Sequence, residues 1–148
     1  MEQLYFLIKT MDRLIEELKP LHSGLFGKDF LLTWERTEAE LKAILKIAEG
    51  LKSLYESNCS TKVFQSGLAV SLFRDHSTRT RFSYASAANL LGLTVQDLDE
   101  GKSQIAHGET VRETANMISF LTEAIGIRDD MYLGCLLYTS DAADEGGS

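Results

Sequence analysis

Hydroxyl and guanidinium side chains gather in one short stretch of the sequence, "SLFRDHSTRTRFSYASAANLLG", residues 71–92. Ser77, Thr78, Arg79, Thr80 and Arg81 lie there between an apolar run and an amphipathic one. Hydroxyls donate hydrogen bonds, and arginine offers a planar charged fork that matches phosphate oxygens. A helix beginning here would add N–H groups and a partial positive charge. The stretch predicts a phosphate site; in the alternative interpretation, Ser77 only caps a helix and both arginines are solvated.

Thiol and metal chemistry are not indicated by the other reactive residue types. Cys59 and Cys135 lack CxxC or Cys/His spacing, so neither a disulfide framework nor a zinc site is expected. The three histidines, His22, His76 and His107, are far apart in the sequence and show no ligand pattern. We therefore expect a protein that uses no metal and no cofactor.

The overall charge and hydropathy limit the partners. The 148 residues carry a formal net charge of −7, and a general nucleic-acid binder would need a basic face instead. No apolar run reaches the roughly 18 residues of a membrane span. The N-terminus carries acids where a signal peptide would be basic and then apolar. We expect one cytoplasmic domain without nucleic-acid or membrane partners.

Two helices are predicted before residue 56. Thr37 and Glu40 form a T-x-x-E capping box, and apolar residues recur at helical spacing through residues 37–55, which predicts a helix with one buried face. Its apolar residues are Leu41, Ile44, Leu45, Ala48, Leu51 and Tyr55. A similar stripe predicts a helix over residues 3–19, ending before Pro20. That helix could pack on the domain or form an oligomer contact, and the sequence does not choose between the two.

Strands and helices alternate in the second part of the chain. Residues 68–73 have the pattern of a buried parallel strand, although periodicity alone does not exclude a short core helix. A helix is predicted from about residue 78 to Gly92, a strand within 93–99, a helix after the T-x-x-E box of Thr110 and Glu113, and a strand at 124–129. The helix after Thr110 should bury Val111, Ala115, Ile118 and Leu121. This order predicts an α/β fold with a parallel sheet flanked by helices. The hydroxyl cluster then follows the carboxyl end of a strand, where such sheets bind ligands.

Three motifs together resemble the aspartate and ornithine carbamoyltransferases: "STRTR" at 77–81, "SQIAHGETVRET" at 103–114 and "IGIRD" at 125–129. The similarity begins at "KDFLLTWERTEAELKAILKIAEGLK" and covers about residues 28–134. Within that family, the sequence of these motifs most resembles the YgeW-type group of knotted carbamoyltransferases. The resemblance implies the carbamoyl phosphate-binding half of a two-domain enzyme that works as a homotrimer.

The resemblance also implies roles for individual residues. The phosphate of carbamoyl phosphate would be held by Ser77, Thr78, Arg79 and Thr80. Arg128, with Thr80, would reach the carbonyl; from the sequence alone, pairing of Arg128 with Asp129 or Asp130 is the preferred interpretation. Ser103 and Gln104 would lie on a loop donated to the neighbouring subunit. For Arg81, which lies two helical positions beyond Arg79, a pairing within the domain or at a subunit interface is expected.

The implied reaction is carbamoyl transfer to the amine of an amino acid or ureido acid, without a covalent enzyme intermediate. His107 stands where aspartate enzymes carry a lysine, so its role is left open. An alternative function is a non-catalytic phosphate-binding or assembly domain of the same fold.

The last residues have a different origin in our interpretation. "CLLYTSDAADE", residues 135–145, matches one reading frame of a transposase-type sequencing adapter. We therefore expect residues 1–134 to be a truncated N-terminal carbamoyl phosphate-binding domain and residues 135–148 to be a non-native tail.

Overall fold

The computed structural model describes residues 2–21, 24–25, 27–73, 77–99 and 110–128. The chain divides into two compact units, residues 1–61 and residues 62–148, and each is described by itself. Within the described residues, the helices are all too short or too polar to cross a membrane.

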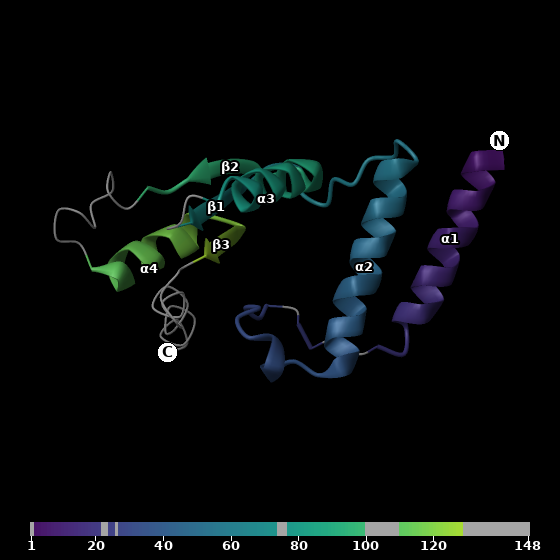
Figure 1. The fold of residues 1–148 in the computed structure, drawn as a ribbon, viewed down its shortest axis with the longest axis horizontal. Coiled ribbons are helices and arrows are strands. Elements are labelled where there is room, and N and C mark those ends of the chain that lie inside the picture. Colours follow the sequence, from purple (N-terminus) through teal and green to yellow (C-terminus); the bar gives the residue numbers. More distant parts are fainter. Residues whose placement is uncertain (1, 22–23, 26, 74–76, 100–109, 129–148) are drawn as a thin grey trace. The chain divides into compact units, whose positions relative to one another are not determined.

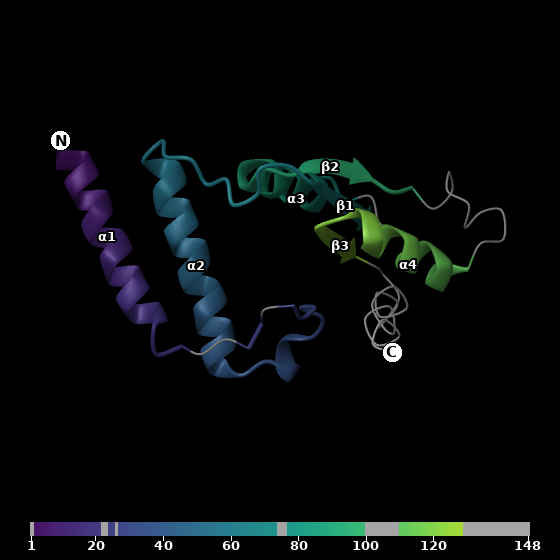
Figure 2. The same cartoon turned by 180° about the vertical axis from the view of Figure 1, so that it is seen from behind.

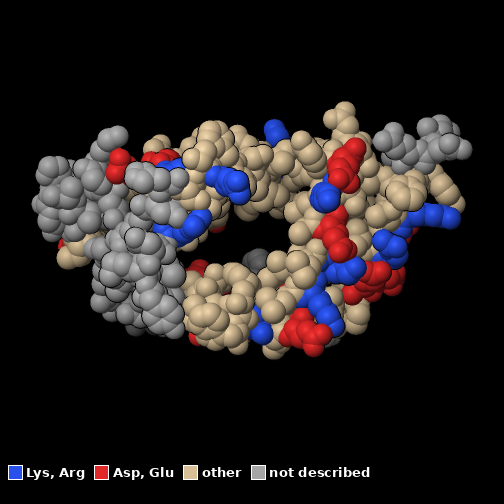
Figure 3. Space-filling model, in the orientation of Figure 1, with Lys and Arg blue, Asp and Glu red and all other residues tan. Residues whose placement is uncertain are grey.

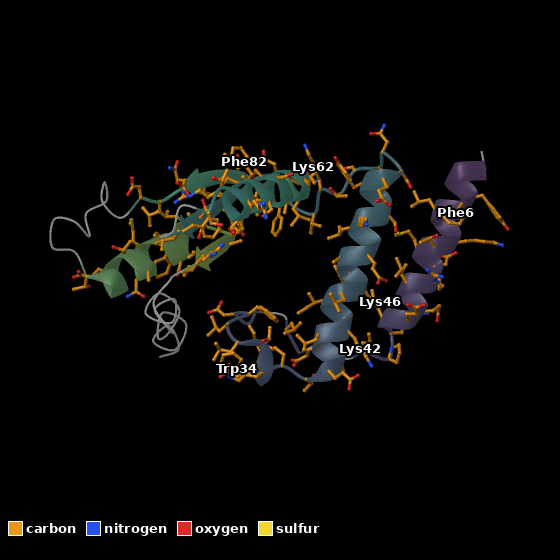
Figure 4. All side chains as sticks on the ribbon, in the orientation of Figure 1. Phe6, Trp34, Lys42, Lys46, Lys62 and Phe82 are labelled. Atoms are coloured by element: carbon orange, nitrogen blue, oxygen red, sulfur yellow. The ribbon has the colours of Figure 1, made fainter. Side chains whose placement is uncertain are left out.

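The first unit is built on a pair of antiparallel helices, α1 (Glu2–Leu18) and α2 (Glu38–Glu56), which lie side by side in both views (Figures 1 and 2). A short 3-10 helix, η1 (Thr33–Glu35), precedes α2. Leu7 and Leu14 of α1 and Ala43 of α2 are buried. Lys46 lies between the two helices (Figure 4), where its Nζ is 2.8 Å from Glu17 Oε2. Acidic and basic side chains intermingle along this helix pair (Figure 3).

The predicted capping box of α2 is confirmed, but its predicted buried face is only partly covered. The Glu40 N–H donates to Thr37 Oγ1 over 3.2 Å, and the Thr37 N–H donates to Glu40 Oε2 over 2.8 Å. Leu45 and Tyr55 are 63% and 58% exposed, so the prediction that they are buried is wrong for this structure. The contact with α1 includes the ion pair of Lys46 with Glu17 and the approach of Leu14 to Gly50. Helical periodicity identifies an apolar stripe without specifying which element covers it.

The second unit contains a parallel sheet. In its described part, the strands are β1 (Leu68–Phe73), β2 (Thr94–Asp97) and β3 (Ala124–Arg128), in the spatial order β2-β1-β3. Helix α3 (Thr78–Leu91) connects β1 to β2, and helix α4 (Val111–Leu121) precedes β3. In register, β1 pairs Ser71 with Asp97 of β2, and Phe73 with Arg128 of β3. The predicted α/β fold with a parallel sheet and flanking helices is therefore confirmed.

The two helices cover opposite faces of the sheet, because β2 and β3 lie on opposite sides of β1 and right-handed crossovers then place their helices on different faces. Ala69 packs with Ala88 of α3 and Leu93 on one face. Leu72 packs with Ala115 of α4 on the other face, together with the partly buried Ile127. Of the residues expected to line the buried face of α4, Ala115 and Ile118 are buried, whereas Leu121 is 66% exposed.

Gly92 ends α3 as predicted. Its φ of 102° lies in the left-handed region, and a Cβ at this position would come within 2.1 Å of the carbonyl oxygen of Phe64. A side chain is excluded by both conformation and space. The tight turn leads directly into Leu93 and β2.

Candidate functional site

The predicted site residues that the structure describes lie at the carboxyl ends of β1 and β3. Helix α3 leaves the end of β1 and leads to β2 on one side, while β3 lies on the other side of β1. The carboxyl ends of parallel strands are where open α/β sheets bind their ligands. Ser77 and Thr80 stand at the start of α3, and Arg128 is the last residue of β3.

Three of the predicted site residues contact one another. Arg128 Nη1 donates to Ser77 Oγ over 2.6 Å and to Thr80 Oγ1 over 2.7 Å. The two hydroxyl oxygens are 2.7 Å apart and share a further hydrogen bond. Some fifty residues of sequence separate Arg128 from the two hydroxyls, so the fold itself creates this cluster. A hydroxyl that accepts from a guanidinium becomes a better donor, and the cluster is therefore suited to an anion.

Ser77 occupies the N-cap position of α3, but its side chain makes no capping hydrogen bond. Its Oγ is directed instead to Thr80 and Arg128. The simpler interpretation, in which Ser77 serves only as a helix cap, does not describe this geometry. The first N–H groups of α3 are not bonded to that hydroxyl, and a helix start of this kind favours a bound anion.

Thr78 and Arg79 are exposed in the first turn of α3. Neither side chain makes a hydrogen bond or ion pair with the residues that the structure describes. They lie on the same turn as Ser77 and Thr80 but outside the cluster with Arg128. A long cationic side chain at a helix start is well placed to meet an anion from solvent.

Arg81 takes part in a separate set of contacts at the ends of β1 and β2. Its guanidinium pairs with Asp97 at the end of β2 and donates to the Phe73 carbonyl oxygen. Asp97 has a second partner in Ser71, a buried residue whose Oγ donates to Asp97 Oδ1 over 2.7 Å. Pairing of Arg81 within the domain was one of the two expected outcomes. Ser71 was missed, although it is the single polar residue in the apolar run 68–73.

The close approach of α3 to β3 depends on Gly126. A Cβ there would lie 2.5 Å from Tyr84 Cε2, so the ring of Tyr84 occupies the space of the missing side chain. The same ring stacks edge-on against Phe73, with centroids 5.6 Å apart. Burial raises the pKa of the Tyr84 phenol above its usual value. A glycine inside a strand signals such close packing.

Two of the predicted site residues, Ser103 and Gln104, lie outside the described residues. The histidines His22, His76 and His107, for which no site role is predicted, also lie outside the described residues. Within the described ranges, acidic, histidine and cysteine side chains do not gather into a cluster of three suited to a metal ion.

An arginine and two hydroxyls thus meet at the carboxyl end of the parallel sheet of an α/β domain, the place where such sheets bind their ligands. Residues 28–141 match the family described as "Aspartate/ornithine carbamoyltransferase, carbamoyl-P binding domain". The chain belongs to this family, as its motifs indicated.

Individual relatives agree with this assignment. The Escherichia coli K12 protein "Putative carbamoyltransferase YgeW" is 70% identical over 128 residues, which make up 86% of this chain and 32% of that protein. Ornithine carbamoyltransferase from a Synechococcus strain is 35% identical over 105 residues, 71% of this chain and 33% of its own length. The chain thus spans about one third of the length of these relatives.

Solved structures show the same fold. The catalytic subunit of M. jannaschii aspartate transcarbamoylase superposes with a TM-score of 0.65 at 25% identity, covering 75% of this chain and 38% of that subunit. Trypanosoma cruzi aspartate transcarbamoylase in complex with carbamoyl phosphate gives a TM-score of 0.68 at 20% identity, covering 76% and 35%. At 20% identity the second likeness shows the fold alone.

Proposed function

We propose that this chain binds carbamoyl phosphate at the carboxyl ends of β1 and β3. Ser77, Thr78, Arg79 and Thr80 hold the phosphate, and Arg128 with Thr80 holds the carbonyl oxygen. The observation that carries this proposal is the convergence of Arg128 Nη1 on the hydroxyls of Ser77 and Thr80. Membership of a family described by its carbamoyl phosphate-binding domain supports the choice of ligand.

The proposed arrangement divides the ligand between two sets of donors. Arg79 and the hydroxyls face the leaving phosphate from the start of α3, where the helix dipole adds positive potential. Arg128 approaches from β3, on the other side of the cluster. Thr80 lies between the two sets, since its hydroxyl touches both Ser77 and Arg128.

These donors would favour carbamoyl transfer once an amine is present. An uncharged amine attacks the carbonyl carbon, negative charge develops on the carbonyl oxygen, and the bond to phosphate breaks. Each donor aimed at such a developing oxyanion typically lowers the barrier by about 3–4 kcal/mol. The departing phosphate can accept the proton that the amine loses, so the proposed step needs no further base.

The complete enzyme, in this proposal, transfers the carbamoyl group to an amino acid or ureido acid and is a cytoplasmic homotrimer. The likeness to ornithine and aspartate carbamoyltransferases supports this class of acceptor. Ser103 and Gln104 would then complete the site of the neighbouring subunit.

Isothermal titration of the 148-residue chain with carbamoyl phosphate and with inorganic phosphate tests the proposal. Arg79→Ala should weaken both ligands by about 10–100-fold, because a charge-assisted hydrogen bond contributes roughly 1.5–3 kcal/mol. Arg128→Ala should weaken carbamoyl phosphate more than inorganic phosphate, since only the former carries a carbonyl. Arg13→Ala, at an exposed ion pair of α1, is the matched control and should bind like wild type.

Equal affinity of wild type and Arg79→Ala for both ligands would contradict the phosphate assignment. Equal losses for the two ligands in Arg128→Ala would contradict the assignment of Arg128 to the carbonyl.

A further inference from the structure

We propose that Arg81, Asp97 and Ser71 form a positioning cluster that holds the first turn of α3 against the ends of β1 and β2. The cluster thereby sets the distance between Arg128 and the hydroxyls of Ser77 and Thr80. This inference rests on the proposed function, because it assigns these residues a role in shaping the same ligand site.

The positioning cluster joins three elements through side-chain contacts. Arg81 belongs to the first turn of α3, and its backbone N–H donates to the carbonyl oxygen of Ser77 over 3.1 Å. Its Nη1 pairs with Asp97 Oδ2 on β2, and its Nη2 lies 2.5 Å from the carbonyl oxygen of Phe73 at the end of β1. Ser71 Oγ holds the other carboxylate oxygen of Asp97. One guanidinium thus links the helix start to two neighbouring strands.

The residues held by the positioning cluster adjoin the proposed site directly. Phe73, whose carbonyl Arg81 contacts, pairs in register with Arg128 on β3. Thr80, which receives a hydrogen bond from Arg128, immediately precedes Arg81. A displacement of the α3 start relative to the sheet would therefore separate Arg128 from both hydroxyls. Misplacement of a site group by about 1 Å can reduce function by as much as a hundredfold.

Arginine suits this role better than lysine would. Its planar fork reaches the Asp97 carboxylate and the Phe73 carbonyl with two different nitrogens, while its central carbon lies 6.0 Å from the centre of the Phe73 ring. A lysine has one nitrogen and no plane, so it cannot reproduce this arrangement. The ion pair contributes little to folding, because the Arg81 and Asp97 side chains are 36% and 49% exposed.

The test uses ¹⁵N-labelled wild type and Arg81→Lys in the 148-residue chain, without ligand and then with inorganic phosphate. We expect Arg81→Lys to shift the amide signals of Ser77 and Thr80 and the Nε–H signal of Arg128. Phosphate affinity should fall at least about tenfold while circular dichroism and the melting temperature stay close to wild type. Asp97→Asn should reproduce both effects, and the double variant should be little worse than either single one, because both changes break one unit. Arg13→Lys is the matched control.

Unchanged signals at Ser77, Thr80 and Arg128 in Arg81→Lys would overturn the proposal, whatever happens to affinity. A loss of affinity with unchanged signals would mean that Arg81 touches the ligand itself. If wild type binds no phosphate, the proposed function fails, and the ligand-free spectra still decide whether Arg81 positions the cluster. If Arg81→Lys does not fold, Ser71→Ala is used in its place. The NMR signals of Ser77, Thr80 and Arg128 should then shift in the same way but by less. Unchanged signals in Ser71→Ala would also overturn the proposal.

Discussion

Replacing Gly126 with alanine tests how tightly α3 packs on β3. The new methyl group would lie 2.5 Å from Tyr84 Cε2 and 2.9 Å from both Cδ2 and Cζ, distances that the present backbone and ring cannot accommodate. The ring also packs edge-on against Phe73. We therefore expect Gly126→Ala to force the ring or the strand to move.

The magnitude follows from two opposing effects. Overpacking a well-filled core typically costs about 1–3 kcal/mol. Alanine in place of glycine in an element interior recovers roughly 0.5–1 kcal/mol, because glycine loses more conformational freedom on folding. The net expectation is a free energy of unfolding lowered by about 0–2.5 kcal/mol, with a central value of about 1 kcal/mol.

Urea denaturation followed by circular dichroism measures this change. Removing the ring with Tyr84→Ala should remove the cost of the new methyl group. In that background, Gly126→Ala should leave the free energy of unfolding unchanged or raise it. Gly50→Ala in α2 is the control, because a Cβ there lies 3.5 Å from Leu14 Cδ1, an ordinary contact, and should stabilise the helix. The same cost for Gly126→Ala with and without the Tyr84 ring would refute the reasoning.

Three further predictions concern the caps, the shared site and the tail. Hydrogen bonds from Thr37 hold the pKa of Glu40 below the usual 4.5, and those from Thr110 do the same for Glu113. Both capping boxes therefore contribute stability above pH 4.5 and lose it as the pH falls through the lowered pKa. Glu40→Gln and Glu113→Gln should therefore weaken the acid dependence of helix content measured by circular dichroism, and an unchanged profile would count against this. If Gln104 serves a neighbouring subunit, wild-type phosphate affinity should rise with protein concentration in a dilution series, whereas Gln104→Ala should show no such rise. Deleting residues 135–148 should change the free energy of unfolding by less than about 0.5 kcal/mol, and a chain that unfolds without them would show that they belong to the domain.

Local signals predicted the elements of this fold well. The capping boxes at Thr37 and Thr110 mark where α2 and α4 begin, and Gly92 marks where α3 ends. These features depend on residues within one turn of each other, so the sequence contains them completely. The predicted buried strand over residues 68–73 is β1 with the same bounds.

Contacts between distant segments could not be predicted in the same way. Leu45 and Leu121 continue apolar stripes but are exposed, since a stripe does not reveal which neighbour covers it. The pairing of Arg81 with Asp97 depends on the register of β1 with β2. For Arg128, the sequence alone favoured a nearby aspartate, and only the family resemblance directed it to the site. In the structure, Arg128 reaches Ser77 and Thr80 at the carboxyl end of the sheet.

The hydrogen bonds that Ser77 and Thr80 accept from Arg128 join three side chains of the domain itself. An arginine side chain carries roughly 2 kcal/mol of rotamer entropy, which an unrestrained side chain would lose on gripping a ligand. Here part of that entropy is already lost when the domain folds, so binding begins from an ordered guanidinium. Binding a ligand to Arg128 therefore costs less side-chain entropy than binding it to an unrestrained arginine would. The affinity then keeps a larger share of the favourable contact energy.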